Sequence, residues 1–336
     1  MDVPMWVWLA TIGAMVVILA VDLAIVDHPW SKKSGPKEFG MKQAAWWATF
    51  YIGIAILFGF GVWYYGGATI AGEYFAGFVT EKSLSVDNLF VFYLIMGSFA
   101  VPKRYQHEVL LIGIVIALIM RGIFIAIGAQ AINAWSEVFY LFGAFLIYTA
   151  VKIVRDHVKK DEEEQDFTQS FAVRMVRQVW PVTDDYHGAK LTVKKDGRRY
   201  VTPMLMVIVA IGVTDLVFAV DSIPAIFGLT QDAYIVFTAN AFALLGLRQL
   251  YFLLAGLMDR LTYISWGLAG IMVFIGVKMI LHALHENGVH VPEISTGLSL
   301  TVILGVMTVT VVASLLRKTP SAGERAGSGP RSIGGE

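Results

Sequence analysis

The sequence contains no cysteine, and this absence excludes disulfide bonds, thiol redox chemistry and thiolate metal sites in this chain of 336 residues. Charge is also scarce, because 15% of the residues are Asp, Glu, Lys or Arg whereas soluble domains carry about a quarter. Acidic and basic residues are equal in number, at 26 each, so no excess positive charge points to a nucleic-acid partner. The remaining composition is apolar, with 57% hydrophobic residues, and predicts a protein embedded in a lipid bilayer.

The first residues, MDVPMWVWLATIGAMVV, lack the basic segment and the cleavage motif of a secretory signal peptide, so they predict a retained transmembrane helix. A spanning helix needs about 20 apolar residues. Stretches of that kind recur along the chain and predict an all-α, polytopic membrane bundle of about nine transmembrane helices. We number these predicted spans 1 to 9; they cover roughly residues 4–26, 43–65, 69–99, 108–128, 136–154, 201–228, 232–257, 262–284 and 296–316.

The segments between the spans predict the orientation of the bundle. Lys and Arg follow every odd-numbered span, whereas the segments after the even-numbered spans contain neither residue. Basic segments stay on the cytoplasmic side of a membrane. The sequence therefore predicts a multi-pass protein of the bacterial plasma membrane, with its N-terminus outside and its C-terminus in the cytoplasm. We call the two ends of the bundle the predicted outer end and the predicted inner end.

The polar segment between spans 5 and 6 is the one sizeable interruption, and it is expected to be a solvated linker with a hairpin around Asp196-Gly197. It is also where a cytoplasmic protein partner would bind. The predicted organisation is helices 1–2 in 1–68, a first repeat of helices 3–5 in 69–154, the cytoplasmic loop in 155–200, a second repeat of helices 6–8 in 201–284, an outer loop with helix 9 in 285–318, and a disordered cytoplasmic tail in 319–336.

The two repeats are recognised by polar residues that recur inside apolar spans. TEKSLSVDNLFVF in span 3 carries Glu81 and Asp87, and TDLVFAVDSIPAIF in span 6 carries Asp215 and Asp221 at the same spacing of six. An arginine and then a lysine follow in the same order in both repeats: Arg121 and Lys152 in the first, Arg248 and Lys278 in the second. Span 3 is predicted to run inward and span 6 outward, so the repeats are inverted. Secondary transporters with inverted repeats bind their substrate near the membrane midplane.

The acids predict a cation site between spans 3 and 6. Carboxylate, amide and hydroxyl oxygens suit hard divalent cations, whereas zinc and copper would recruit His or Cys. Buried carboxylates also take up protons, which metal entry would displace. The predicted ligands are Glu81, Asp87, Asn88, Asp215, Asp221 and Ser222, with support from Ser83, Ser85, Asn240, Arg121, Arg248 and Lys278.

Two alternatives stay open from the residues alone. The acids can pair with Arg121, Arg248, Lys152 or Lys278 and hold the bundle together without binding any ion. The arginines are interpreted as charge balance for the acids rather than as ligands. Asn240 suits either helix–helix hydrogen bonding or a polar site.

These residues resemble the TerC family of integral membrane proteins. The likeness rests on EKSLSVDNLFVF at 81–92, TDLVFAVDSIPAIF at 214–227 and ANAFALLGLRQLYF at 239–252, and it extends over about 5–316. The family is named for tellurite resistance, is linked to manganese export and metal homeostasis, and is placed near the LysE-type exporters. The resemblance thus implies Mn²⁺ efflux carried by the four acids, with Asn88 and Ser222 assisting.

The expected function is therefore export of a divalent metal cation, with Mn²⁺ as the expected ion, by alternating access and proton exchange. The cation is the transported substrate; no prosthetic group and no enzyme activity are expected. The alternatives are an exporter of small cationic organic solutes and a non-transporting membrane partner of stress-response or metallo-enzyme maturation proteins. Tellurite, an oxyanion, fits an acid-lined cavity badly, so resistance to it is expected to be indirect.

Overall fold

The computed structural model describes residues 3–27, 41–135, 137–159, 168, 170–183, 185–195, 197–254 and 263–316. The predicted tail at 319–336, most of 160–169 and Asp196 lie outside them. Within the described part the chain is helical apart from one β-hairpin. Its elements are α1 (Met5–Asp27), α2 (Met41–Ser98), α3 (Lys103–Ala134), α4 (Val138–Lys159), α5 (Phe171–Val179), β1 (Thr192–Lys195), β2 (Arg198–Val201), α6 (Pro203–Phe227), α7 (Ala233–Leu244), α8 (Leu247–Leu254), α9 (Ile264–Glu286) and α10 (Thr296–Leu316).

Seven membrane-length apolar spans occur in the described residues, judged by length and composition, and α1 is a further, shorter apolar stretch. One of the seven is α2, whose 58 residues would extend about 87 Å if straight. The chain turns at Gly67, where φ is 84°, a conformation that glycine adopts without a steric penalty. The parts on either side pack together, since Tyr74 Oη donates to the Ala55 carbonyl at 3.0 Å. Predicted spans 2 and 3 are therefore the two arms of α2.

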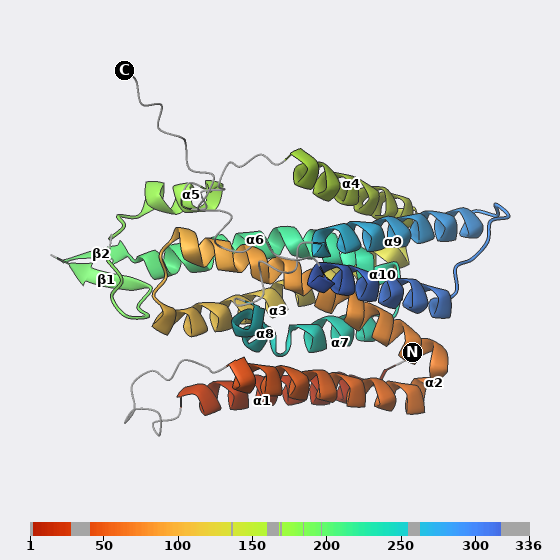
Figure 1. The fold of residues 1–336 in the computed structure, drawn as a ribbon, viewed down its shortest axis with the longest axis horizontal. Coiled ribbons are helices and arrows are strands. Elements are labelled where there is room, and N and C mark those ends of the chain that lie inside the picture. The colour runs from red at the N-terminus through yellow and green to blue at the C-terminus, as the bar shows by residue number, and fades with distance from the viewer. Residues whose placement is uncertain are drawn as a thin grey trace, which may run out of the picture.

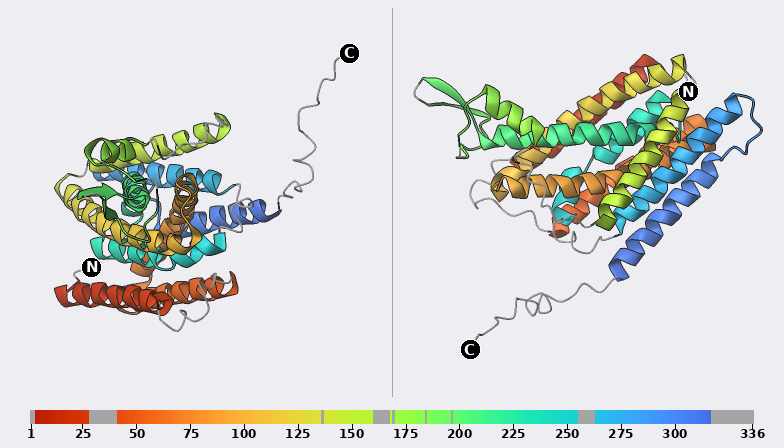
Figure 2. Two further views of the ribbon diagram at one scale, coloured as in Figure 1. Left: turned by 90° about the vertical axis from the view of Figure 1, so that its left-hand side faces the viewer. Right: turned by 90° about the horizontal axis from the view of Figure 1, so that it is seen from above.

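The helices lie side by side along the long axis of the molecule (Figure 1). Figure 2 shows α1 and the first arm of α2 on the side opposite α4. The hairpin and α5 lie at one end, and the connection between α9 and α10 lies at the other. The most extensive helix pairs are α4 with α9, α2 with α7 and α3 with α6. The pairing of α4 with α9 joins equivalent spans of the two predicted repeats, 5 and 8, and the pairings of α2 with α7 and of α3 with α6 are corresponding contacts between the repeats; the inverted relation itself stays a prediction.

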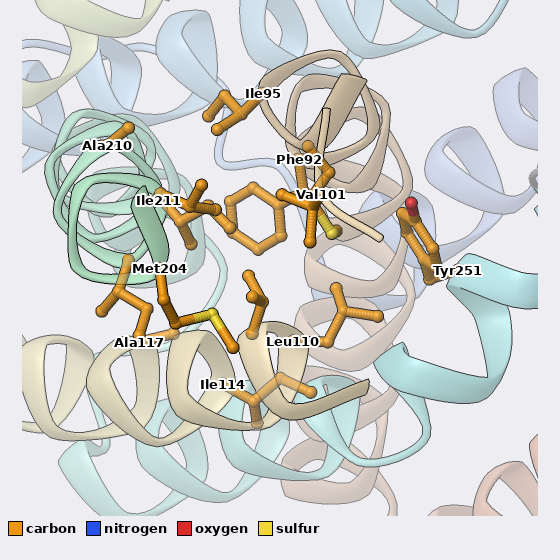
Figure 3. Close-up of a cluster of buried hydrophobic side chains, with 14 of the residues drawn as sticks. Phe92, Ile95, Val101, Leu110, Ile114, Ala117, Met204, Ala210, Ile211 and Tyr251 are labelled. Carbon is orange, nitrogen blue, oxygen red and sulfur yellow. The ribbon is translucent and has the colours of Figure 1, made fainter. Parts of the chain in front are cut away.

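A large apolar core lies where α2, α3 and α6 meet at the predicted inner end. Phe92, Leu110 and Met204 are almost fully buried there, one from each helix (Figure 3). Because the second arm of α2, α3 and α6 each contribute to this cluster, their relative positions are fixed by apolar packing. This arrangement brings polar residues of the same three helices to a common level.

The crossing of α4 and α9 is unusually close because two glycines face each other. A Cβ on Gly143 would lie 2.8 Å from the Gly276 carbonyl oxygen, and a Cβ on Gly276 would lie 2.8 Å from the Gly143 carbonyl oxygen. One helical heptad further on, Ala150 and Ala269 are both buried in one cluster. Small residues at a helix–helix contact allow backbones to approach closely in a membrane.

The 155–200 segment differs in part from the expected solvated linker. The hairpin is confirmed, with Lys195 paired to Arg198 around the turn. The segment also packs on the bundle, however, because Val173 of α5 is fully buried in the inner-end core. Tyr186 donates a hydrogen bond to the Phe99 carbonyl at 2.9 Å. The many charged residues of this segment predicted exposure to solvent, whereas the docking depends on a few apolar residues such as Val173.

Candidate functional site

Two of the predicted acids meet at one arginine in the interior of the bundle. Glu81 on α2 forms an ion pair with Nη1 of Arg121 on α3, and Nη2 of the same guanidinium lies 3.6 Å from Asp215 Oδ1 on α6. All three side chains are almost completely buried. Glu81 lies 14 residues beyond the Gly67 turn, or about 21 Å along the helix, which is well inside a bilayer core of about 30 Å.

Two amides complete the surroundings of the guanidinium. Arg121 Nη1 donates to Asn240 Oδ1 on α7 at 3.3 Å. Asn88 lies two helical turns beyond Glu81. With the orientation of its amide that satisfies both of its neighbours, it accepts from Arg121 Nη2 at 3.2 Å while its amide nitrogen donates to the Leu84 carbonyl at 3.0 Å. Arg121 thus joins four helices, α2, α3, α6 and α7, through polar contacts. We call Glu81, Asn88, Arg121, Asp215 and Asn240 the central cluster.

Several buried polar atoms in and beside the central cluster have no hydrogen-bond partner among the described residues. They include the second carboxylate oxygens of Glu81 and Asp215 and the amide nitrogen of Asn240. The hydroxyls of Thr80, Ser85 and Ser222 are likewise buried without a hydrogen-bond partner among the described residues. Leaving a buried polar group unpaired costs about 1–3 kcal/mol each. A concentration of such atoms at one level of a membrane bundle is typical of a place that takes up a proton, water or an ion.

The other predicted site residues are less closely associated with this cluster. Asp221 is half-buried and accepts from Thr149 Oγ1 on α4 at 3.3 Å, while Lys152 acts electrostatically on the same carboxylate. Ser83 donates to the Val79 carbonyl of its own helix at 2.6 Å. Arg248 is buried on α8. The side chain of Asp87 lies outside the described part of the structure.

No group of three or more His, Asp or Glu side chains suited to a metal ion occurs among the residues that the structure describes. The two central acids share Arg121 instead of each having a basic partner of its own. The charge balance that was predicted for Arg121 is thus visible in its contacts. The convergence of all four acids on one ion stays a prediction.

A cavity of about 590 Å³ opens at the predicted outer end. Lys278 lies in its wall on α9 and interacts electrostatically with Glu73 on α2, so this lysine belongs to the cavity. Thr230 Oγ1 donates to Glu73 Oε2 at 2.6 Å, and Gln231 Nε2 lies 2.9 Å from His282 Nε2. The lining is mixed in charge, and its polar residues include Glu73, Thr230, Asp232, Lys278, His282 and Glu293.

Two residues with no role predicted from the sequence contact site helices in the structure. Thr149 binds Asp221, and its position one helical turn before Lys152 was the available signal. Lys82 contacts the end of α7, although it stands inside the very motif that carries Glu81. Only the acids, serines and asparagine of this motif were assigned a role from the sequence.

Comparison with known proteins adds the family. Residues 66–322 match the family described as "Integral membrane protein TerC family". The chain is 44% identical over 312 residues to the uncharacterized membrane protein Rv2723 of Mycobacterium tuberculosis, covering 90% of this chain and 78% of that protein. It is 37% identical over 310 residues to the uncharacterized membrane protein STKORF319 of Myxococcus xanthus, covering 92% of each.

A third relative carries a functional name. The chain is 37% identical over 308 residues to the putative membrane-bound redox modulator Alx of Escherichia coli, covering 89% of this chain and 92% of that protein. No solved structure matches the chain significantly. The match to the family spans about three quarters of the sequence and includes every residue of the central cluster. The chain is therefore a member of the TerC family of integral membrane proteins.

Proposed function

We propose that the protein exports a divalent metal cation, with Mn²⁺ as the expected ion, through the central cluster. The observation that supports this best is the burial of Glu81 and Asp215 near mid-bundle, each with one carboxylate oxygen that has no partner in the described structure. Intramembrane carboxylates are expensive, and proteins retain them chiefly where an ion or a proton passes. The carboxylate, hydroxyl and amide oxygens of this region suit a hard divalent cation.

Arg121 sets the condition for ion binding in this proposal. Its guanidinium occupies the space between the two carboxylates, so a divalent ion and Arg121 compete for the same oxygens. The neutral amides of Asn88 and Asn240 can release the guanidinium without leaving a charge behind. Protons on the acids would likewise be displaced by a metal ion, which supports exchange of metal for protons.

The cavity at the predicted outer end is the proposed exit. Its acidic residues, Glu73, Asp232 and Glu293, favour a cation that leaves the bundle there. Lys278 in the wall of the same cavity opposes a cation, and its interaction with Glu73 offsets part of that charge. An ion leaving the central cluster would therefore be drawn toward the acidic residues of the cavity and would not be held tightly there.

Transport from loaded vesicles tests the proposal directly. Purified protein is reconstituted into Mn²⁺-loaded proteoliposomes, and efflux is followed at two external pH values. Glu81→Gln and Asp215→Asn should reduce efflux to that of Mn²⁺-loaded liposomes without protein. The variant Glu137→Gln, at an exposed position, should transport like the unchanged protein. Full efflux by both central variants would refute the proposal. Unlabelled lysine and arginine in excess provide the competing test, since an exporter of cationic organic solutes would be inhibited by them.

A non-transporting role as a docking partner is the second candidate, because α5 presents an apolar stripe to solvent. Phe171, Met175 and Val179 follow at intervals of four and are 78%, 50% and 65% exposed, while Val173 on the other face is buried. Replacing all three exposed residues with Ser leaves the buried face intact. Loss of a cellular metal-tolerance phenotype with unchanged Mn²⁺ efflux in vesicles would favour this role.

A further inference from the structure

The interruption of predicted span 7 lies inside the bundle and is in contact with a lysine. The helix ends at Leu244 and restarts at Leu247, and Gly246 between them has a φ of 77°. Lys82 Nζ, on the second arm of α2, donates to the Ala243 carbonyl at 2.9 Å and to the Leu245 carbonyl at 3.0 Å. Both hydrogen bonds reach carbonyls at the end of α7.

The Lys82 ammonium and the interrupted helix satisfy each other's hydrogen bonds. The last four carbonyls of a helix have no partner within it, and the bilayer core offers no water to satisfy them. These carbonyls also form the negative end of the helix dipole, which attracts a cation. A buried ammonium in turn needs acceptors, because its desolvation would otherwise be costly. Two charge-assisted hydrogen bonds satisfy both requirements at one point.

The two predicted repeats differ at this residue and at the helix that faces it. Glu81 is followed by Lys82, whereas the equivalent Asp215 is followed by Leu216. The second arm of α2 packs on α7 and α8, and α6 packs on α3. The helix that faces Lys82 is interrupted, whereas α3, which faces the helix of Leu216, is continuous from Lys103 to Ala134. The lysine and the interruption therefore occur together, in one half of the molecule only.

We propose that Lys82 is a tethered cation that holds span 7 in its interrupted form and thereby positions Asn240 against Arg121. Asn240 lies three residues before Ala243, on the helix whose end Lys82 binds. Neighbouring residues of a helix point about 100° apart. One turn of α2 thus carries two contacts: Glu81 binds the arginine, and Lys82 fixes the helix that supplies the amide to the same arginine. Lys82 is a positioning residue in this arrangement.

The tightness of the turn beside Lys82 supports a defined role for the interruption. A Cβ on Gly246 would lie 3.0 Å from the Tyr51 ring, which is itself buried. Tyr51 of the first arm of α2 therefore lies against the glycine, while Lys82 of the second arm binds the adjacent carbonyls. Both arms of α2 thus enclose the interruption, and a change in either arm reaches it directly.

Hydrogen–deuterium exchange of the purified protein in lipid nanodiscs tests the proposal, and it does not depend on cation transport. In Lys82→Met, which keeps most of the side-chain volume but removes the charge, amides of residues 244–250 should exchange roughly tenfold to a hundredfold faster, because two charged hydrogen bonds are lost. Lys82→Arg should restore slow exchange. Leu216→Met is the matched control in the other repeat and should leave the exchange rate of residues 244–250 unchanged. Exchange of 244–250 in Lys82→Met at the rate of the unchanged protein would overturn the proposal.

A second measurement applies if Lys82→Met yields no folded protein. Lys82→Ala is then expressed and purified with propylammonium or, in parallel, with 1-propanol at the same concentration. Recovery of folded protein with the amine alone identifies the charge as the stabilising feature. Equal recovery with the alcohol, or none with either, would mean that Lys82 acts through packing and would refute the proposal. Neither readout involves metal flux, so its failure is distinct from failure of the proposed transport.

Discussion

Replacing Arg121 with Met removes the only described positive charge that contacts Glu81 and Asp215. The central cluster carries two carboxylates and one guanidinium, and the substitution leaves both carboxylates buried without a counter-charge. Breaking a buried ion pair by removing one partner costs about 3–5 kcal/mol. At roughly 2–4 °C per kcal/mol, the melting temperature should fall by about 6–20 °C. The loss is therefore large enough to measure in a detergent-solubilised protein.

The companion variants separate charge from shape. Glu81→Gln keeps Arg121 paired with Asp215 and should cost much less than Arg121→Met. The triple variant Glu81→Gln, Asp215→Asn, Arg121→Met contains no unpaired charge in the cluster and should recover most of the lost stability, since neutral replacements of buried ion pairs are often tolerated. The destabilisation of Arg121→Met should also shrink as the pH falls, because protonation neutralises the two acids.

The assay is a thermal scan of fluorescence from the nine tryptophans, at several pH values, for all four proteins. The unchanged protein, Glu81→Gln and the triple variant should have similar stabilities, and Arg121→Met should be well below them. A melting temperature of Arg121→Met within about 2 °C of the unchanged protein would show that the ion pairs contribute little. A triple variant as unstable as Arg121→Met would attribute the loss to packing instead.

Two further predictions concern packing and pH. Gly276→Ala should destabilise the protein by about 1–3 kcal/mol, because its Cβ would lie 2.8 Å from the Gly143 carbonyl, whereas Gly270→Ala, whose nearest neighbour would be 4.0 Å away, should not; thermal scans of the pair decide this. Burial raises the pKa of Tyr186 to about 12. Since a tyrosine in the unfolded chain has a pKa of about 10, its contribution to stability is complete below pH 10 and is lost as the pH rises toward 12. Tyr186→Phe should therefore flatten the fall of the melting temperature between pH 10 and 12, and an unchanged slope would contradict the assignment.

The membrane-embedded helical architecture could be predicted from the sequence because apolar length is a strong signal. The predicted spans 296–316 and 201–228 differ little from α10 and α6. The hairpin around Asp196-Gly197 was also predicted correctly, since alternating residues around a two-residue turn are a local pattern. Signals that depend on a stretch of neighbouring residues were therefore reliable.

The turn at Gly67 falls between predicted spans 2 and 3, whereas the break in span 7 was not predicted because it rests on a single glycine. Gly246 adopts a positive φ, yet glycine also occurs frequently within continuous transmembrane helices. The run ALLGLRQL contains no proline that would mark an interruption. The deciding contacts, from Lys82 and Tyr51, come from residues far away in the chain. Long-range contacts of this kind are invisible to local pattern.

The acids of the site were found from their repeat, but their partners were only partly found. Glu81 and Asp215 occupy equivalent positions in the two repeats, and the structure brings them to the same arginine. Arg121 was interpreted as charge balance from its place inside an apolar span and its equivalence to Arg248 in the other repeat. What the repeat could not show is that one arginine serves both acids, because that depends on which helices cross at the level of Arg121.

The central cluster and the interruption of span 7 are built on the same principle. In each, a buried negative feature is neutralised by a positive side chain of the protein itself: Arg121 between two carboxylates, and Lys82 on two carbonyls. In the proposed transport cycle a metal ion must replace the first of these cations while the second keeps α7 in place. Arg121 contacts Asn240, and Lys82 contacts carbonyls about one turn further along the same helix, so this part of α7 stays held when Arg121 withdraws. The movement that admits an ion is therefore expected in α3, which carries Arg121, rather than in α7.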